Sequence, residues 1–317
     1  MFDVYDFLLG GATPLCVAAL VFGIGWAASR RPAVAWPLGV ILGFAVGVTA
    51  LEARETTVVA ALEKLGSPSV AHEWATLLGL VAVVPAIAGA ILGKRRWLSW
   101  ILAAGVASAA PLWLLWGGKY LPSRELRESG FATSAWGAPQ ATAILAAVAV
   151  LLLAAWFLWG AADSRNSPLV RSILAVLSLT GAAVVAGLTG SFVYAQLFGV
   201  LAAAVGGCLG AAWLLKAPAG PEAAAGPTVM IAGSLLLLAA CYSELHLLQA
   251  AGVWASIVLA AGWIAGLARL PGKGQLAVRL VACLLPLIIV VSHAAVVFAE
   301  TQRQQQEERE SNPYLNL

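Results

Sequence analysis

The sequence predicts an all-α fold, a polytopic bundle of about ten transmembrane helices. Hydrophobic residues make up 61% of the 317 residues and charged residues only 10%, whereas soluble domains carry about 25% charged residues. The mean hydropathy is +0.90. Apolar runs of about 20 residues, the length that crosses the hydrocarbon core of a bilayer, recur along the chain. A soluble protein is therefore excluded, and the lipid bilayer is the first expected partner.

These runs predict spans at residues 7–28, 35–52, 75–93, 97–116, 141–162, 170–189, 191–215, 229–249, 250–268 and 276–299. The chain begins with the acidic residues Asp3 and Asp6, whereas a secretory signal peptide begins with a positively charged region. We therefore expect the first span to be retained. Residues 1–299 should form one transmembrane domain, and residues 300–317 a polar C-terminal tail.

Small residues spaced four apart predict close helix packing in two of the spans. The second span carries Gly39, Gly43 and Gly47 on one face, and the seventh carries a similar stripe from Ala202 to Gly210. Such stripes allow a neighbouring helix to approach closely. The connection 53–74 is polar but repeats apolar residues at helical spacing, so a short helix on the membrane surface is expected there.

The charge distribution predicts the orientation of the spans. With the N-terminus outside, the inner connections receive 11 of the 18 Lys and Arg residues but only two of the 15 acidic residues. The inner net charge is then +9 and the outer −6, as the positive-inside rule requires. This placement puts both the N-terminus and the C-terminus on the outer side of the membrane. The membrane itself is expected to be a bacterial cytoplasmic (inner) membrane. The overall net charge of +3 gives no reason to expect a nucleic-acid partner.

The clearest candidate for function is Glu244, which together with His246 falls inside the predicted span 229–249. An ionisable residue within a membrane span is costly and is functional by default. The two side chains are two residues apart, so on one helix they point about 200° away from each other. We favour Glu244 as the proton-binding group. The alternative is structural, with Glu244 paired to Arg54 or Arg303.

Other polar residues fall toward the same outer side. Candidates for a proton or substrate site besides Glu244 and His246 are His293, Tyr194, Gln196, Glu52 and Glu300. His72 and Glu73 are expected to be surface loop residues. The chain has no HExxH or HxxxH spacing, no Walker loop and no GxSxG sequence, so no metal centre and no cofactor are predicted.

Two classes of function fit these observations. The first is a transporter or channel-like protein, not an enzyme, with a protonatable site in the outer half lined by Glu244, His293, Tyr194 and Gln196. The alternative is a quinol-interacting membrane subunit of a redox complex, in which a carboxylate or imidazole accepts protons beside an apolar tail pocket. A quinone would then be bound. A third possibility is a scaffold or assembly subunit whose tail recruits an extracytoplasmic partner, or a homo-oligomer.

Two short stretches resemble a known family. Phe7-Leu8-Leu9-Gly10-Gly11 resembles the start of the polysulfide-reductase membrane-subunit family, and Leu51-Glu52-Ala53-Arg54 is similar to its acid-and-basic motif after the second span. The resemblance implies partner subunits with iron–sulfur or molybdopterin groups. The glycine and proline expected around Arg54 are missing from this chain, so the chain is not assigned to that family.

Overall fold

The computed structural model describes Tyr5 and residues 8–68, 70–92, 96–128, 134–160, 168–218, 220–243, 245–261 and 272–311. Within these ranges the fold is helical, with one isolated bridge between Trp116 and Leu121. The elements are η1 (Leu8–Ala12, a π-helix), α2 (Thr13–Ser29), α3 (Pro32–Glu55), α4 (Val58–Gly66), α5 (Ala71–Ile91), α6 (Arg96–Leu115), α7 (Arg124–Glu128), α8 (Ala138–Gly160), α9 (Pro168–Leu188), α10 (Phe192–Leu214), η3 (Pro221–Ala224, a 3-10 helix), α11 (Ala225–Tyr242), α12 (Leu247–Ala261) and α13 (Gly272–Ser311).

Nine of the helices in the described ranges are long and apolar enough to cross a membrane. They contain α2, α3, α5, α6, α8, α9, α10, α11 and α13. The shorter α12 is also apolar. The chain is thus an all-α, multi-pass membrane protein, as the hydropathy predicts.

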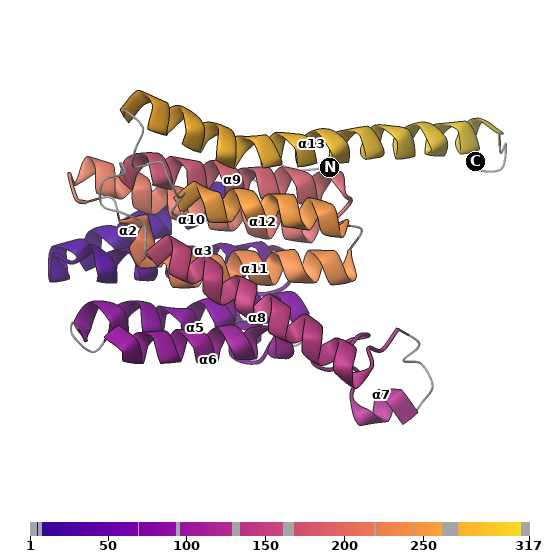
Figure 1. Ribbon diagram of the computed structural model, residues 1–317, viewed down its shortest axis with the longest axis horizontal. Coiled ribbons are helices and arrows are strands. Elements are labelled where there is room, and N and C mark those ends of the chain that lie inside the picture. Colours follow the sequence, from indigo (N-terminus) through magenta and orange to yellow (C-terminus); the bar gives the residue numbers. More distant parts are fainter. Residues whose placement is uncertain are drawn as a thin grey trace.

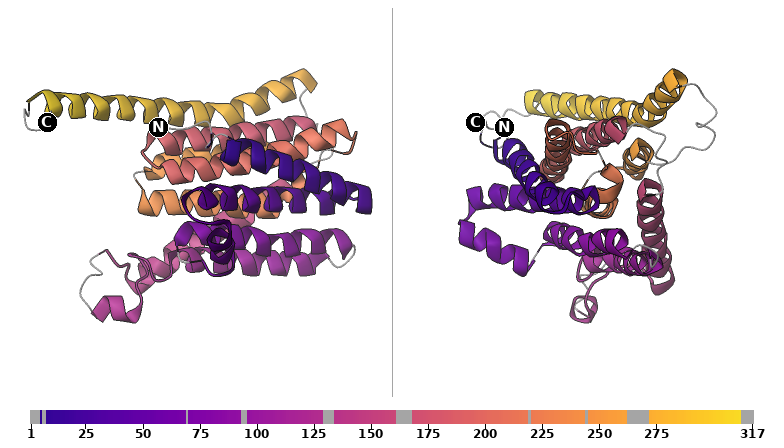
Figure 2. Two further views of the ribbon diagram at one scale, coloured as in Figure 1. Left: turned by 180° about the vertical axis from the view of Figure 1, so that it is seen from behind. Right: turned by 90° about the vertical axis from the view of Figure 1, so that its left-hand side faces the viewer.

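Most of the long helices run side by side and alternate in direction, whereas α8 slants across the bundle (Figure 1). One end of the bundle, here the Glu52 end, holds the last turn of α3, helix α4 and the turn between α11 and α12. The opposite end, the Arg171 end, holds the first turns of α9 and α13. Seen along the helices, α13 lies on the outside of the bundle (Figure 2).

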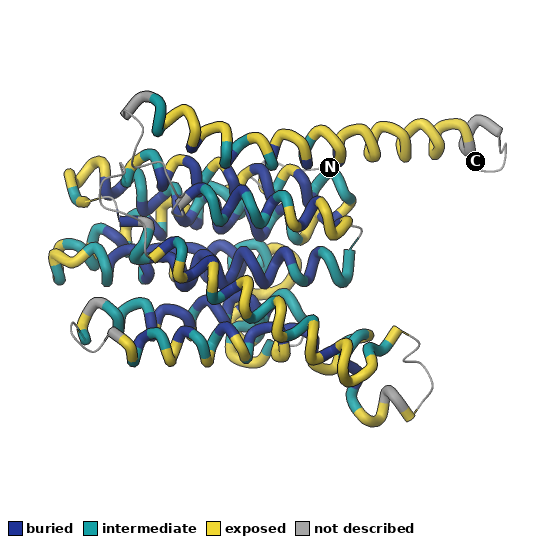
Figure 3. The backbone as a smooth tube through the Cα atoms, in the orientation of Figure 1, coloured by how far each residue is buried: buried dark blue, intermediate teal, exposed yellow. Residues whose placement is uncertain are grey.

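Helix α11 is the centre of the bundle. Its described side chains are buried along nearly the whole helix (Figure 3), and it packs against α3, α5, α6, α8, α10 and α12. Gly233 lets Leu152 of α8 and Trp254 of α12 approach its backbone. A helix that is apolar on all sides is expected at such a position.

The first small-residue stripe packs as predicted. Gly43 faces Ala18 and Pro14 of α2, while Gly39 faces Ala18 and Cys208 of α10. The second stripe packs only in part: Ala202 is buried, but a Cβ built on Gly206 would meet Val176 only at 4.0 Å, and nothing lies within 4 Å of one built on Gly210. Its neighbour Gly207 makes the close contact instead, against the backbone of Leu15.

The predicted span 229–249 is wrong in its boundaries. The helix begins earlier, at Ala225, and ends at Tyr242. Ser243 Oγ donates a hydrogen bond to the Ala239 carbonyl (2.6 Å) at the end of α11. Gln249 Oε1 accepts one from His246 N (3.0 Å) at the start of α12. These polar side chains occupy helix ends, where backbone groups lack partners within the helix, and do not lie in a continuous span.

The polar connection 53–74 and the polar C-terminal segment both contain helix. The helix predicted in the connection 53–74 is confirmed as α4, whose N-cap Thr57 accepts a hydrogen bond from Ala60 N (3.2 Å); its place on the membrane surface stays a prediction. The predicted tail from residue 300 continues α13 as a helix as far as Ser311, and residues 300–307 of it are exposed. It projects beyond the rest of the bundle (Figure 1).

The close α2–α3 contact predicts the effect of a single added methyl group. In a Gly43→Ala variant the new Cβ would lie 2.6 Å from Ala18 Cβ and 2.9 Å from the Pro14 carbonyl oxygen. We expect a loss of about 1–3 kcal/mol from overpacking, measured as a lower midpoint of thermal unfolding in detergent by tryptophan fluorescence. Gly105→Ala is the control, because nothing lies within 4 Å of that position. Equal midpoints for the two variants would contradict the close approach.

Candidate functional site

Four ionisable side chains meet at the Glu52 end, and we name them the Glu52 cluster. Glu52 comes from the last turn of α3, Lys64 from α4, and His72 and Glu73 from the first turn of α5. Lys64 Nζ lies 3.7 Å from Glu52 Oε2 and 3.8 Å from Glu73 Oε1. His72 Nε2 lies 4.0 Å from Glu52 Oε1. One ammonium group therefore lies between two carboxylates.

Local structure fixes the acidic members of this cluster. Glu73 is only 5% exposed, and its Oε2 accepts a hydrogen bond from Val70 N (3.1 Å) at the start of α5. A carboxylate there is stabilised by the helix dipole and satisfies a backbone donor. The Glu52 side chain is 16% exposed, whereas that of Lys64 is 38% exposed. Lys64 is the member that can most easily leave for water.

A small cavity borders the cluster, between α3, α4 and α5. Its volume is about 10 Å³, which is room for roughly one water molecule. It is lined by Val48, Thr49 and Glu52 of α3, Lys64 and Leu65 of α4, and Glu73 and Thr76 of α5. Polar groups thus continue from the cluster into the interface between α3 and α5.

The same residues have the composition of a metal site. Glu52, His72 and Glu73 each offer one ligand atom, and these atoms lie within 4.8 Å of one another. Carboxylate oxygen and imidazole nitrogen are ligands of zinc and similar ions. Lys64 already supplies the positive charge between the two carboxylates. A metal ion would have to compete with that ammonium group.

Aromatic side chains with polar contacts form a second group at the Glu52 end. Tyr120 donates a hydrogen bond to the Cys241 carbonyl (3.0 Å) and stacks on Trp136, with ring centroids 4.7 Å apart. Lys119 Nζ lies 4.8 Å from the Tyr120 centroid and 5.5 Å from that of Tyr242. The loop after α6 is thus attached to the end of α11 by a hydrogen bond, ring stacking and cation–π contacts.

The structure distributes the predicted site residues over several places. Glu52 lies in the cluster. Tyr194 of α10 lies near Tyr242 and Cys241, and Gln196 is half-buried on the same helix. His293 of α13 pairs with Gln249 of α12, whose Nε2 donates to His293 Nδ1 (3.2 Å).

Of the remaining candidates, His246 lies in a turn, Glu300 lies on an exposed helix, and Glu244 is not among the residues that the structure describes. His246 is exposed in the turn before α12, where its Nδ1 accepts a hydrogen bond from Leu248 N (3.3 Å). Glu300 is exposed on α13. Glu244 lies outside the described residues, between Ser243 and Leu245. The described contacts do not join His293 to Tyr194 or Gln196.

The expectation that His72 and Glu73 are surface loop residues is wrong. Helix α5 begins at Ala71, four residues before the predicted span, and Glu73 is buried. Lys64 was not a candidate at all. One sequence signal was present: Glu73 stands in the first turn of an apolar helix, where an acidic residue commonly satisfies the free N–H groups. The sequence carries no signal that α4 folds back onto α5.

No protein-family model, curated protein or solved structure matches this chain at a level that shows a relationship. The site therefore has to be interpreted from its own geometry.

The position of Lys64 between two carboxylates predicts its effect on stability. We expect Lys64→Met to cost about 1–3 kcal/mol, because it leaves the two acidic groups without their shared cation. Adding Glu73→Gln should recover part of this loss by removing one negative charge. The midpoint of thermal unfolding in detergent is the measurement.

The control is the exposed Arg124–Glu128 pair of α7, whose atoms are closer (2.8 Å) but whose side chains are 91% and 64% exposed. Arg124→Gln should change stability by less than about 0.5 kcal/mol, because solvent screens such pairs. A larger effect of Arg124→Gln than of Lys64→Met would contradict the assignment.

Proposed function

We propose that this membrane protein is a transporter or channel-like protein in which the Glu52 cluster is the protonatable site. One observation carries the proposal: two carboxylates, an ammonium group and an imidazole from three helices meet where spanning helices end. Ionisable groups on membrane-spanning helices mark ion and proton pathways in membrane proteins. The charge bias of the connections supports an outer location for this end, in a bacterial inner membrane.

The geometry suggests how proton binding would change the structure. A proton on Glu52 or Glu73 neutralises one carboxylate and weakens its attraction to Lys64. Lys64 belongs to α4, a nine-residue helix that packs against α3 and α5. Of its larger apolar side chains, Val58, Val59 and Leu62 are exposed. Ala61 is the buried apolar side chain of α4, so we expect that weakening the ion pairs by protonation would loosen α4 over the polar cavity.

The proposal is tested by proton flux in proteoliposomes that contain a pH-sensitive dye. The wild-type protein should dissipate an imposed pH gradient faster than empty liposomes. Glu52→Gln should slow this flux at least about tenfold, as expected where one essential proton-transfer group is removed. The amount of the Glu52→Gln variant in the membrane should equal that of the wild-type protein.

Glu55→Gln is the matched control, since Glu55 is the exposed last residue of the same helix. Wild-type flux equal to that of empty liposomes would refute the proposal. So would equal flux in the Glu52 and Glu55 variants.

An apolar groove supports a second candidate function, a quinol-interacting subunit of a redox complex with an extracytoplasmic partner. The groove has a volume of about 560 Å³ and is lined by apolar side chains of α8, α11 and α12. Leu247 lines it next to His246. Quinol oxidation needs an apolar tail pocket and a group that accepts protons, and His246, which directly precedes Leu247, is the candidate for that group.

The quinone candidate is tested by extracting the purified protein with organic solvent and analysing the extract by mass spectrometry. A stoichiometric quinone that is lost from an Ala251→Trp variant would support it, because Ala251 lines the groove. Leu20→Trp is the control, since Leu20 is exposed on α2, a helix that does not line the groove. Absence of quinone from the wild-type extract would remove this candidate.

A further inference from the structure

The Arg171 end contains two buried arginines whose positive charges exceed the negative charge beside them. Arg171 of α9 is 1% exposed and Arg279 of α13 is 4% exposed. Arg171 Nη2 donates to Glu222 Oε2 of η3 (3.1 Å). Nε and Nη1 of both arginines have no hydrogen-bond partner among the described residues.

The packing of α9 against α13 brings these two side chains together. Ser178 of α9 contacts Cys283 of α13, with Oγ and Sγ 3.2 Å apart. Arg171 is seven residues before Ser178 and Arg279 is four before Cys283, so each lies on the same helix face as the contact residue. At 1.5 Å per residue the two Cα atoms differ in depth by only about 4–5 Å. The two charges are close enough to repel each other.

Among the described residues, one carboxylate, that of Glu222, is paired with these two charges. A guanidinium group stays protonated in proteins, so the pair keeps two positive charges against the single carboxylate of Glu222. That carboxylate is 37% exposed, and its ion pair within the described part of the chain is with Arg171. Helices α9 and α13 both begin at this end, so the positive ends of their dipoles add to the excess.

We propose that Arg171 and Arg279 together bind a phosphate group at the Arg171 end. Arginine forms paired hydrogen bonds with phosphate oxygens, and the four unpartnered nitrogens supply donors from two directions. The phosphate belongs either to an anionic phospholipid headgroup or to a free phosphate ion. This site is separate from the Glu52 cluster and does not depend on the proposed transport function.

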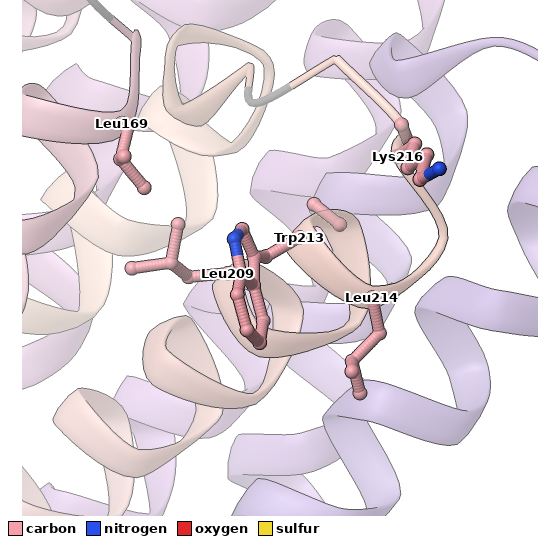
Figure 4. A pocket seen from close by; sticks show the side chains of 7 residues that line it. Leu169, Leu209, Trp213, Leu214 and Lys216 are labelled. Atoms are coloured by element: carbon pink, nitrogen blue, oxygen red, sulfur yellow. The ribbon is translucent and has the colours of Figure 1, made fainter.

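A larger pocket at the Arg171 end is distinct from the proposed phosphate site. It has a volume of about 550 Å³, and its lining is mainly apolar, with Lys216 as a charged member (Figure 4). Leu169 lines it, but Arg171 is two residues farther along α9 and so points about 200° away. The phosphate site is therefore assigned to the interface of α9, η3 and α13 and not to this pocket.

The test uses the full-length protein, stripped of lipid in mild detergent, and follows the midpoint of thermal unfolding. Inorganic phosphate is titrated at constant ionic strength, and phosphatidylglycerol is compared with phosphatidylcholine. A saturable rise with inorganic phosphate identifies a free-anion site, whereas a rise with phosphatidylglycerol alone identifies a headgroup site. Arg171→Gln and Arg279→Gln should each weaken the apparent affinity about tenfold or more, which corresponds to about 1.4 kcal/mol.

Two further variants make the result decisive. Arg124→Gln removes an exposed arginine of α7 and should leave the affinity unchanged. Glu222→Gln should strengthen binding, because it removes the competing negative charge from Arg171; it also serves if the arginine variants do not fold. The proposal is overturned if neither phosphate source shifts the midpoint. It is also overturned if the shift survives both arginine substitutions, or if Glu222→Gln leaves the affinity unchanged or lower.

Discussion

The cost of placing polar groups among apolar helices decides where the polar side chains of this bundle lie. An unsatisfied polar group away from water costs several kcal/mol. In the interior, Ser178 Oγ lies 2.9 Å from Ser256 Oγ, and both side chains contact Cys283. This small network joins α9, α12 and α13 and leaves little polar surface exposed. The same network fixes the relative depth of Arg171 and Arg279.

Hydropathy and small-residue spacing were enough to predict most of the architecture. Nine predicted spans correspond to long apolar helices in the described ranges, and the stripe around Gly43 packs as its spacing indicates. These features depend on residues close in sequence. A run of apolar residues must be buried in lipid or protein wherever it occurs, and glycines four apart must lie on one helix face.

The failures concern features that depend on distant contacts or on side-chain capping. The apolar run through Tyr242 and Leu247 continues across a turn, because Leu245 keeps the hydropathy high while Ser243 and Gln249 bond to helix ends. Hydropathy alone therefore placed the boundary between the two helices at residues 249 and 250, whereas α11 ends at Tyr242 and α12 begins at Leu247. Burial of Glu73 requires α4 to fold back against α5, and nothing in the local sequence encodes that contact.

The two ends of the bundle differ in how their charge can be balanced. At the Glu52 end, carboxylates, an imidazole and an ammonium group lie together, and carboxylates and imidazoles can bind and release protons. At the Arg171 end, guanidinium groups cannot do so. Proton exchange could therefore adjust the charge of the first cluster, whereas the described residues of the second hold two guanidinium groups against one carboxylate. A proton and an anion are accordingly the ligands that the chemistry of the two ends favours, and each end calls for its own assay.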